Sequence, residues 1–544
     1  MSKHPAWLRY ALAATLCLAS AIAAPAQQPP APAPDAAPAA KPEPPKAETK
    51  ITKKQAKELF ALVDELIAFS STESGLPVKS TVKRQITSRN AVESYLSEKF
   101  NEDEGAKRMQ RGEIVLKKFG LLDRDFELKP FLLALLKEQI EAYYDSKTKT
   151  VNMLDWVDVE EQKPVLAHEL THALQDQHSD LEKWNDQTPD EVSTDSAGDS
   201  DHIAKDELDT ARDAVAEGQA TAVMMDYVLK PLGKSLVKNP EVLDLVKNQM
   251  SGTDNSPVLA RAPILLSESL LFPYREGLSF EQDIWMDKGQ GAAFAGALDR
   301  PPTSTWEVIN PLEYEKQHTP AVPLLPNIHP LVDKLYKALD IGQVGQLDLQ
   351  ILAEIFGGES AARDLTPAWN GGIYWAGQLL SVKTPAEQLS TSSLALFYLS
   401  AWRNQASAQA FTQLYAKNLG RKYSALKADP EHQRSDLPNG ETELVYSSAE
   451  GPIVITTRGK LVFTAESFPL EVARQLTEEI LDAQGTGETK LAQTAAPVPE
   501  VTGTRTLDTT NRPELEPLTG DLVRFFAEAG VMKAAVHFAM QAAK

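Results

Sequence analysis

Apolar side chains recur every three or four positions along much of the chain, which is the spacing of an amphipathic helix. This spacing predicts helices over 52–69, 88–100, 131–140, 208–229, 331–356 and 386–418, one that begins at Pro164, and one from about 517 to the end. Short runs rich in β-branched and aromatic residues predict strands over 142–144, 150–154, 442–447, 452–457 and 460–464. The expected fold is therefore α+β and mostly α, with a small sheet and a short β element in an α-rich C-terminal region.

Shifts in composition divide the chain into segments. Residues 27–50 are almost all Ala, Pro, Lys, Glu and Gln, a composition that favours extended, disordered chain. A Pro-rich stretch at 320–330 and a Gly- and Ala-containing linker at 484–504 mark two further boundaries. We therefore expect a first folded domain over 51–320, an α+β C-terminal region over 331–483 and a terminal helical segment over 505–544.

The N-terminal end has the features of an export signal. Lys3 and Arg9 precede an apolar run over 10–22, and this run is too short for a comfortable membrane span. Small residues of the kind that signal peptidase accepts follow this run, so residues 1–26 are expected to form a signal peptide. The protein is then exported to the periplasm or the medium without stable membrane insertion, and an uncleaved anchor is the alternative.

Charge and cysteine content narrow the possible functions. The 544 residues carry a formal net charge of −21, and such a field repels nucleic acid rather than binding it. The one cysteine, Cys17, lies inside the apolar run of the expected signal peptide. The mature chain therefore has neither disulfides nor thiolate metal sites, and any metal site must use His, Asp or Glu.

The strongest chemical signal is the sequence HELTH over 168–172. Positions four apart face the same way on a helix, so His168 and His172 can direct two imidazoles at one zinc ion. Glu169 sits beside the first ligand, where its carboxylate can reach a water on the metal and act as general base. A surface helix with a chance pair of histidines is the alternative interpretation.

A catalytic zinc needs a third protein ligand and an open position. The best candidate is Glu217, which lies in the middle of a predicted helix among small residues, in the sequence AVAEGQAT. Small residues let two helix backbones approach closely, so a short side chain can reach the metal. Asp213 and Asp226 on nearby turns are rival candidates, and an ordinary exposed carboxylate is the alternative for Glu217.

The segment 168–176 resembles the zinc helix of the thermolysin-like gluzincins. The resemblance implies a gluzincin-like catalytic domain in which His168, His172 and Glu217 bind Zn²⁺ and Glu169 is the catalytic base. The spacing departs from that family, because Glu217 follows the second histidine by 45 positions. Thr221 also stands where the family keeps an aspartate that orients a zinc-binding histidine, and Asp176 or Asp226 are candidates for that role.

The chain is also similar to a bacterial group of exported HExxH zinc peptidases. The matching pieces lie at 143–145, 168–178, 217–221, 272–277, 300–305 and 369–372. The first three are the specific ones. This resemblance implies an exported metallopeptidase acting on a peptide or protein substrate. The alternatives are an envelope scaffold that binds zinc without turnover and a zinc hydrolase of a non-peptide amide.

Other residues carry weaker signals. The run 150–154 is either an edge strand that holds an extended peptide or a structural strand. Tyr274, Arg275 and His318 are candidates for stabilising an oxyanion, although each fits a structural role as well. His178 is expected to point away from the zinc. The acidic segment 182–209 lacks the order of a calcium loop and is expected to be solvated chain.

Overall fold

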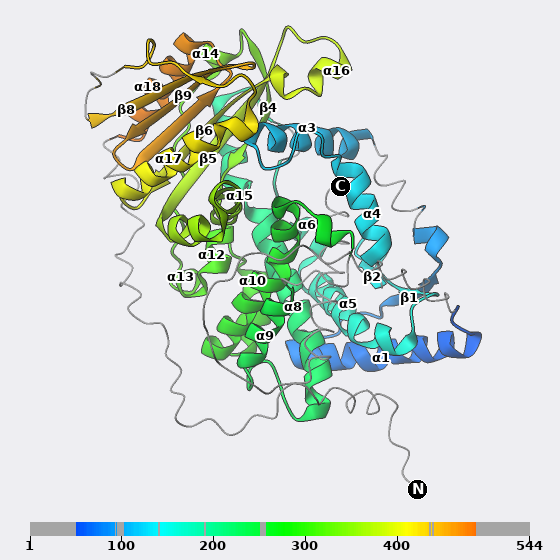
Figure 1. The fold of residues 1–544 in the computed structure, drawn as a ribbon. Helices are drawn as coiled ribbons and strands as arrows, with labels where there is room; N and C mark the ends of the chain where they lie inside the picture. The colour runs from blue at the N-terminus through cyan, green and yellow to red at the C-terminus, as the bar shows by residue number, and fades with distance from the viewer. Residues whose placement is uncertain are drawn as a thin grey trace, which may run out of the picture.

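The computed structural model describes residues 50–485, apart from 93, 95–102, 140–141, 186, 190–191, 251–256, 435–436 and 438–439. Within these residues the fold is α+β and mostly helical, as the periodicity predicts. A helical part and a part built on a large sheet lie next to each other (Figure 1). The expected signal peptide and terminal helical segment lie outside the described residues, as do nearly all of both linkers.

The helical part contains most of the helices of the first 320 residues. They are α1 (Lys53–Ser74), α3 (Asp103–Phe119), α4 (Leu128–Gln139), α5 (Val159–Ser179), α6 (Leu181–Asn185), α7 (Ser196–Lys205), α8 (Leu208–Leu229), α9 (Glu241–Met250), α10 (Ile264–Lys288), α11 (Ala297–Asp299), α12 (Thr305–Ile309) and α13 (Pro311–Glu315). Helix α8 coincides with the predicted 208–229. Residues 89–92 and 94 of the predicted helix 88–100 are helical and Ser88 is not, whereas 93 and 95–100 are outside the described part.

Helix α5 begins earlier than predicted. Asp158 caps it by accepting the backbone N–H of Glu160 at 2.8 Å, and Pro164 lies inside the helix rather than at its start. An aspartate at the N-cap satisfies an amide that the helix itself leaves without a partner, so the helix can begin at Val159. Residues 168–172 are consequently in the middle of a long, buried helix.

A three-stranded sheet lies beside α5. Strand β3 (Thr150–Leu154) is central, pairing in parallel with β1 (Lys83–Thr87) and antiparallel with β2 (Ala142–Asp145). The predicted strands 142–144 and 150–154 are confirmed as β2 and β3, and they form a hairpin. The interpretation of 150–154 as an edge strand is wrong, because β1 occupies the side that would have been open. Strands β1 and β2 are the outer strands instead, and β2 is the one that contacts Glu169 of α5.

The part after residue 328 is built on a seven-stranded sheet in the order β4-β5-β6-β10-β9-β8-β7. The strands are β4 (Tyr336–Gln343), β5 (Trp369–Leu379), β6 (Leu394–Trp402), β7 (Lys427–Ala428), β8 (Thr442–Ser448), β9 (Gly451–Arg458) and β10 (Leu461–Glu466). Helices α15 (Gln346–Leu365) and α17 (Gln405–Lys422) pack on one face, and α14 (His329–Val332) and α18 (Leu470–Ala483) on the other. The short helix α16 (Pro385–Gln388) lies in a connection.

This sheet corrects two predicted helices. Residues 336–343 and 394–402, expected within the helices 331–356 and 386–418, are strands β4 and β6. Every residue of β6 is buried, and its sequence is apolar apart from Ser400, so it lacks the alternation of a half-exposed strand. The predicted strands at 442–447, 452–457 and 460–464 are confirmed as β8, β9 and β10.

Two glycines allow α8 and α10 to pack in close contact. A Cβ at Gly218 would lie 2.3 Å from the carbonyl oxygen of Gly277, and one at Gly277 would lie 2.1 Å from that of Ala214. Both distances are too short for any side chain, so only glycine permits this approach. The contact places Glu217, next to Gly218, deep between α10 and α5. None of the helices in the described part has the length and apolar character needed to cross a membrane.

Candidate metal centre

Helix α5 presents two imidazoles on one side. His168 and His172 are one turn apart, and both are buried, with exposed fractions of 1% and 9%. Helix α8 crosses close to them, and Glu217 in its middle is 3% exposed. Two helices that are distant in sequence therefore bring three ligating side chains to one buried point.

The three ligand atoms form a tight triangle. The Nε2 atoms of His168 and His172 are 3.0 Å apart. Oε2 of Glu217 lies 3.0 Å from Nε2 of His168 and 3.5 Å from Nε2 of His172. Within the described residues, this is the one group of three or more His, Cys, Asp or Glu side chains arranged to hold a metal ion.

The triangle fits a small tetrahedral ion. Bonds of about 2.0–2.1 Å to each ligand put the ligand atoms of such an ion about 3.3 Å apart, close to the three observed separations. Two imidazole nitrogens and one carboxylate oxygen are also a donor set that zinc accepts. The His168, His172 and Glu217 side chains can therefore hold a metal ion, as the sequence predicts.

The rival third ligands have other partners. Asp213 accepts a hydrogen bond from the side-chain amide of Asn185 at 3.1 Å. Asp226 accepts the backbone N–H of Leu236 at 2.6 Å, and burial raises its pKa to about 6. Neither belongs to the metal-binding group, so the structure brings Glu217 to the histidines instead of its rivals.

Gln175 orients His172. Its Nε2 donates to the carbonyl of Ala216 and to Oε1 of Gln219, both at 2.9 Å, which leaves its Oε1 to face the imidazole. Nδ1 of His172 donates to that oxygen at 2.8 Å. Protonation at Nδ1 leaves the lone pair of a neutral imidazole on Nε2, the nitrogen that faces His168 and Glu217.

Sequence reasoning missed Gln175 because it searched for a carboxylate. Neither Asp176 nor Asp226 fills the orienting role, and Thr221 is buried without a hydrogen bond from its hydroxyl. The available signal was spacing, since Gln175 follows His172 by three positions on the same helix and so shares its face.

Glu169 points to the outer strand of the small sheet. Its Oε2 accepts the backbone N–H of Tyr144, in β2, at 2.8 Å. Asp176, two turns further along α5, accepts the hydroxyl of Tyr144 at 2.7 Å and the ammonium of Lys149 at 2.8 Å. These contacts hold the β2–β3 hairpin against α5, with the Glu169 carboxylate at the edge of the sheet.

Tyr274 of α10 completes the inner wall. Its ring lies nearly parallel to that of His168, with 6.4 Å between the ring centroids, and it is 1% exposed. Burial first, and then the adjacent charge of Glu217, raise the pKa of Tyr274 far above its usual value. The phenol is therefore protonated, and its ring is buried beside His168.

The other predicted candidates lie elsewhere. Arg275 is paired with Glu268 at 2.5 Å, and His318 with Glu313 at 2.7 Å. His178 is paired with Asp299 at 2.9 Å and takes no part in the metal-binding group, as predicted. The acidic segment 182–209 was expected to be solvated chain, but it contains the helices α6 and α7.

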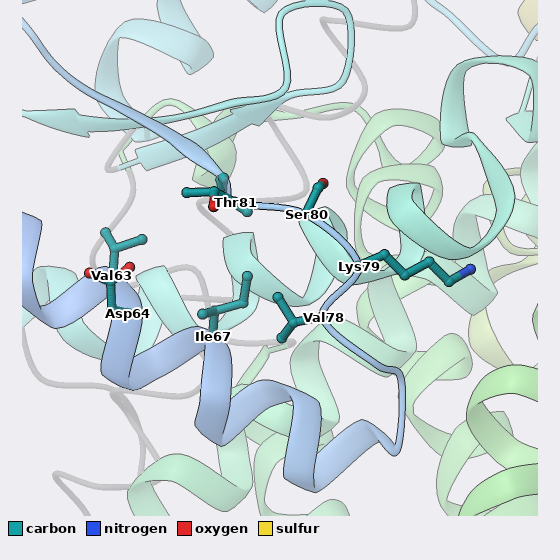
Figure 2. A pocket seen from close by; sticks show the side chains of 8 residues that line it. Val63, Asp64, Ile67, Val78, Lys79, Ser80 and Thr81 are labelled. Atoms are coloured by element: carbon teal, nitrogen blue, oxygen red, sulfur yellow. The ribbon is translucent and has the colours of Figure 1, made fainter.

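A separate hollow of about 320 Å³ lies between α1 and the segment 78–82 that leads into β1. Val78 and Ile67 lie side by side there, whereas Lys79 extends away (Figure 2). Its acidic residue, Asp64, is already paired with Arg84 at 2.7 Å. Nothing in this hollow adds to the metal centre.

Comparisons with known protein families, with curated proteins and with solved structures find no match. The geometry of the site is therefore the basis for assigning a function.

Proposed function

We propose that the chain is a zinc-dependent peptidase in which Glu169 is the general base. The observation that carries the proposal is the convergence of His168, His172 and Glu217 on one point, with Glu169 beside His168 on the same helix. A structural zinc site commonly has four protein ligands, whereas three ligands leave a position open for catalysis. A zinc ion held by these residues would polarise a carbonyl and activate water at neutral pH.

The protein groups around the ligands support this role. Glu169 lies on the same helix as the imidazoles and is held by the Tyr144 amide, so its carboxylate is fixed near the reacting atoms. A positioned carboxylate can take a proton from water and deliver it to a leaving amine. Its hydrogen bond to a backbone amide is one that an approaching substrate can replace.

The outer strand β2 supports a peptide as substrate. Tyr144 directs its N–H to Glu169 and away from β3, so this face of β2 borders the candidate centre. An extended peptide can pair with such an edge and bring its backbone next to the carboxylate. We therefore assign the binding of an extended peptide to β2 instead of β3, because β3 is paired on both sides.

The arrangement also supports kinship with the gluzincins. Two histidines on one helix and a glutamate on a second helix are the pattern that the resemblance implies. Gln175 in place of an aspartate, and the wide spacing before Glu217, are the features in which this chain differs.

Two alternatives are separated by one experiment. The mature protein, loaded with zinc or stripped by a chelator, is incubated with casein and with a peptide library, and new N-termini are identified by mass spectrometry. We expect cleavage that requires zinc. Metal binding without new N-termini would favour a scaffold, or a hydrolase of non-peptide amides if a panel of such amides is consumed.

We also propose that the peptidase acts outside the cytoplasm. The basic start and apolar run of residues 1–26 support this location. The mature protein should begin between Ala24 and Gln27, which N-terminal sequencing of envelope and secreted fractions would test. An intact chain in the membrane fraction would indicate an anchor.

A further inference from the structure

A cavity of about 310 Å³ lies between the helical part and the large sheet. It is at the N-terminal end of α8, so Glu207 is about 15 Å along that helix from Glu217. One side of the cavity is apolar, formed by Val115 and Phe119 of α3 and by Leu347 and Leu352 of α15.

The lining also carries four carboxylates, which belong to Asp206, Glu207, Asp340 and Asp348. The donors that reach three of them are uncharged. Asp206 accepts the N–H of Gln343 at 2.7 Å, Asp348 that of Gly345 at 2.9 Å, and Glu207 the hydroxyl of Thr305 at 2.8 Å. Tyr374, which also lines the cavity, is hydrogen-bonded to Asp340, and the charge of Arg111 acts on this acid as well.

Glu207 is a buried acid with an unsatisfied oxygen atom. It is 5% exposed, and its Oε2 has no hydrogen-bond partner among the described residues. Leaving a buried carboxylate oxygen without a donor is costly. The site is therefore incomplete as the protein alone forms it.

Two glycines, which lack side chains, leave space for two of the carboxylates. A Cβ at Gly345 would lie 1.9 Å from Oε1 of Glu207, and one at Gly342 would lie 2.3 Å from Oδ2 of Asp206. Burial and the neighbouring acids raise the pKa of Glu207 to about 8, and burial raises that of Asp340 to about 6. Both pKa values are raised because burial disfavours the ionised carboxylate and no nearby positive charge fully compensates for it.

We propose that this cavity binds a small organic cation with an aliphatic body, such as an alkyl diamine. Its ammonium groups would lie against the carboxylates and its methylene groups against the apolar side. The volume is at the lower end of the range for small-molecule sites, which bury an apolar body and fix it with a few polar groups.

The spacing of the acids favours an organic cation over a metal ion. The described residues contain one group whose ligand atoms are close enough for a metal, and that group is His168, His172 and Glu217. The cavity acids are too far apart for three of them to meet one ion. Separate N–H groups of an alkyl ammonium can reach them individually.

The test measures binding to the mature protein at pH 8 by calorimetry and thermal melting, with 1,4-diaminobutane as the probe. Butane-1,4-diol is the uncharged control and CaCl₂ the metal control. We expect saturable one-to-one binding of the diamine and a rise in melting temperature that neither control produces. A lysine-containing tripeptide distinguishes a peptide side chain from a free diamine as the source of the same ammonium chemistry.

Matched variants locate the site. Glu207→Gln and Asp348→Asn keep the shape of the side chain but remove its charge, so each should fold and should weaken diamine binding at least tenfold. Asp201→Asn alters an exposed acid of the neighbouring helix α7, paired with Lys205, and should bind as the wild type does.

No binding of the diamine, equal shifts with the diol, a shift with calcium alone, or unchanged affinity in Glu207→Gln would each overturn the proposal. These measurements do not use peptide hydrolysis. Their failure is therefore distinct from failure of the proposed peptidase function.

Discussion

Nδ1 of His172 donates a hydrogen bond to Oε1 of Gln175 at 2.8 Å, and the amide group of Gln175 is itself fixed by two acceptors. The second acceptor, Gln219, donates in turn to the carbonyls of Ala293 and Phe294 in a short π-helical turn. An imidazole of the candidate metal centre is thus oriented by a chain of amides that runs from α5 through α8. This arrangement fixes the tautomer without placing a second buried charge behind the ligand.

Gln175→Leu should therefore weaken metal binding without removing a ligand. Loss of a partner behind a metal-binding histidine typically costs 10–100-fold in affinity, and we expect a loss in that range. Competition with a chelator measures it. Gln177→Leu is the matched control, because Gln177 lies on the same helix and contacts Lys79 and Ser80 instead. Equal affinities in both variants would show that the Gln175 contact is dispensable.

Glu217→Ala should abolish stoichiometric zinc binding. Two imidazoles remain, but the triangle loses the oxygen that lies 3.0 Å from His168. Elemental analysis of the purified variant should find much less than one zinc per chain, with a circular dichroism spectrum like that of the wild type. His318→Ala and Asp226→Ala should each keep the metal, and a loss of zinc in one of these with retention in Glu217→Ala would move the ligand assignment to that residue.

The metal-binding residues could be predicted because their chemistry follows local rules. The spacing of His168 and His172 determines a common helix face, and the absence of cysteine restricts the third ligand to a few residue types. Glu217 stood out because Gly218 and its small neighbours signal a close helix contact, which the structure contains at Gly277. The helical periodicity of 208–229 likewise predicted the bounds of α8.

The missed features depend on tertiary contacts. Strand β6 is buried on both faces, so it has no periodicity to separate it from a helix. The central position of β3 depends on β1, which is more than 60 residues away in sequence and pairs with it in parallel. The contact between Glu169 and Tyr144 uses a backbone amide, which leaves no trace in residue identity.

Gly277→Ala should disturb the site through packing alone. The added Cβ would meet the carbonyl oxygen of Ala214 at 2.1 Å, and backbone on a packed helix cannot move aside easily. Overpacking of this kind costs about 1–3 kcal/mol, so the melting temperature should fall and zinc should be held less tightly. Gly291→Ala is the control, because a Cβ there meets no atom within 4 Å. Similar melting temperatures for both variants would contradict the close contact of α8 and α10.

The acidic cavity predicts how stability depends on pH. Burial raises the pKa of Glu207 to about 8 from an ordinary value of 4.5, so the folded protein holds this proton more tightly than the unfolded chain does. The free energy of unfolding should then decrease as the pH rises from about 4.5 through about 8. Burial also raises the pKa values of Asp206, Asp348 and Asp340, so these acids act in the same direction.

Denaturant titrations at pH 5 and pH 8 measure this dependence. Glu207→Gln removes the titrating group, so its free energy of unfolding should change less between the two values than that of the wild type. Saturation with the diamine should have a similar effect, because a bound cation stabilises the ionised acid. Equal pH dependence in the variant and the wild type would show that Glu207 does not titrate in this range.

Glu169→Gln tests the proposed base directly. Glutamine keeps the size of the side chain and an oxygen that can accept the Tyr144 amide, so fold and zinc content should match the wild type. What is lost is the ability to take up a proton. General acid–base groups contribute about 10²–10⁴-fold to rate, so the turnover of a peptide substrate should fall by at least that lower factor. Glu169→Asp retains the base on a shorter arm and should recover part of the activity. Full turnover in Glu169→Gln, with zinc still bound, would exclude this residue as the base and leave the metal centre without its proposed proton carrier.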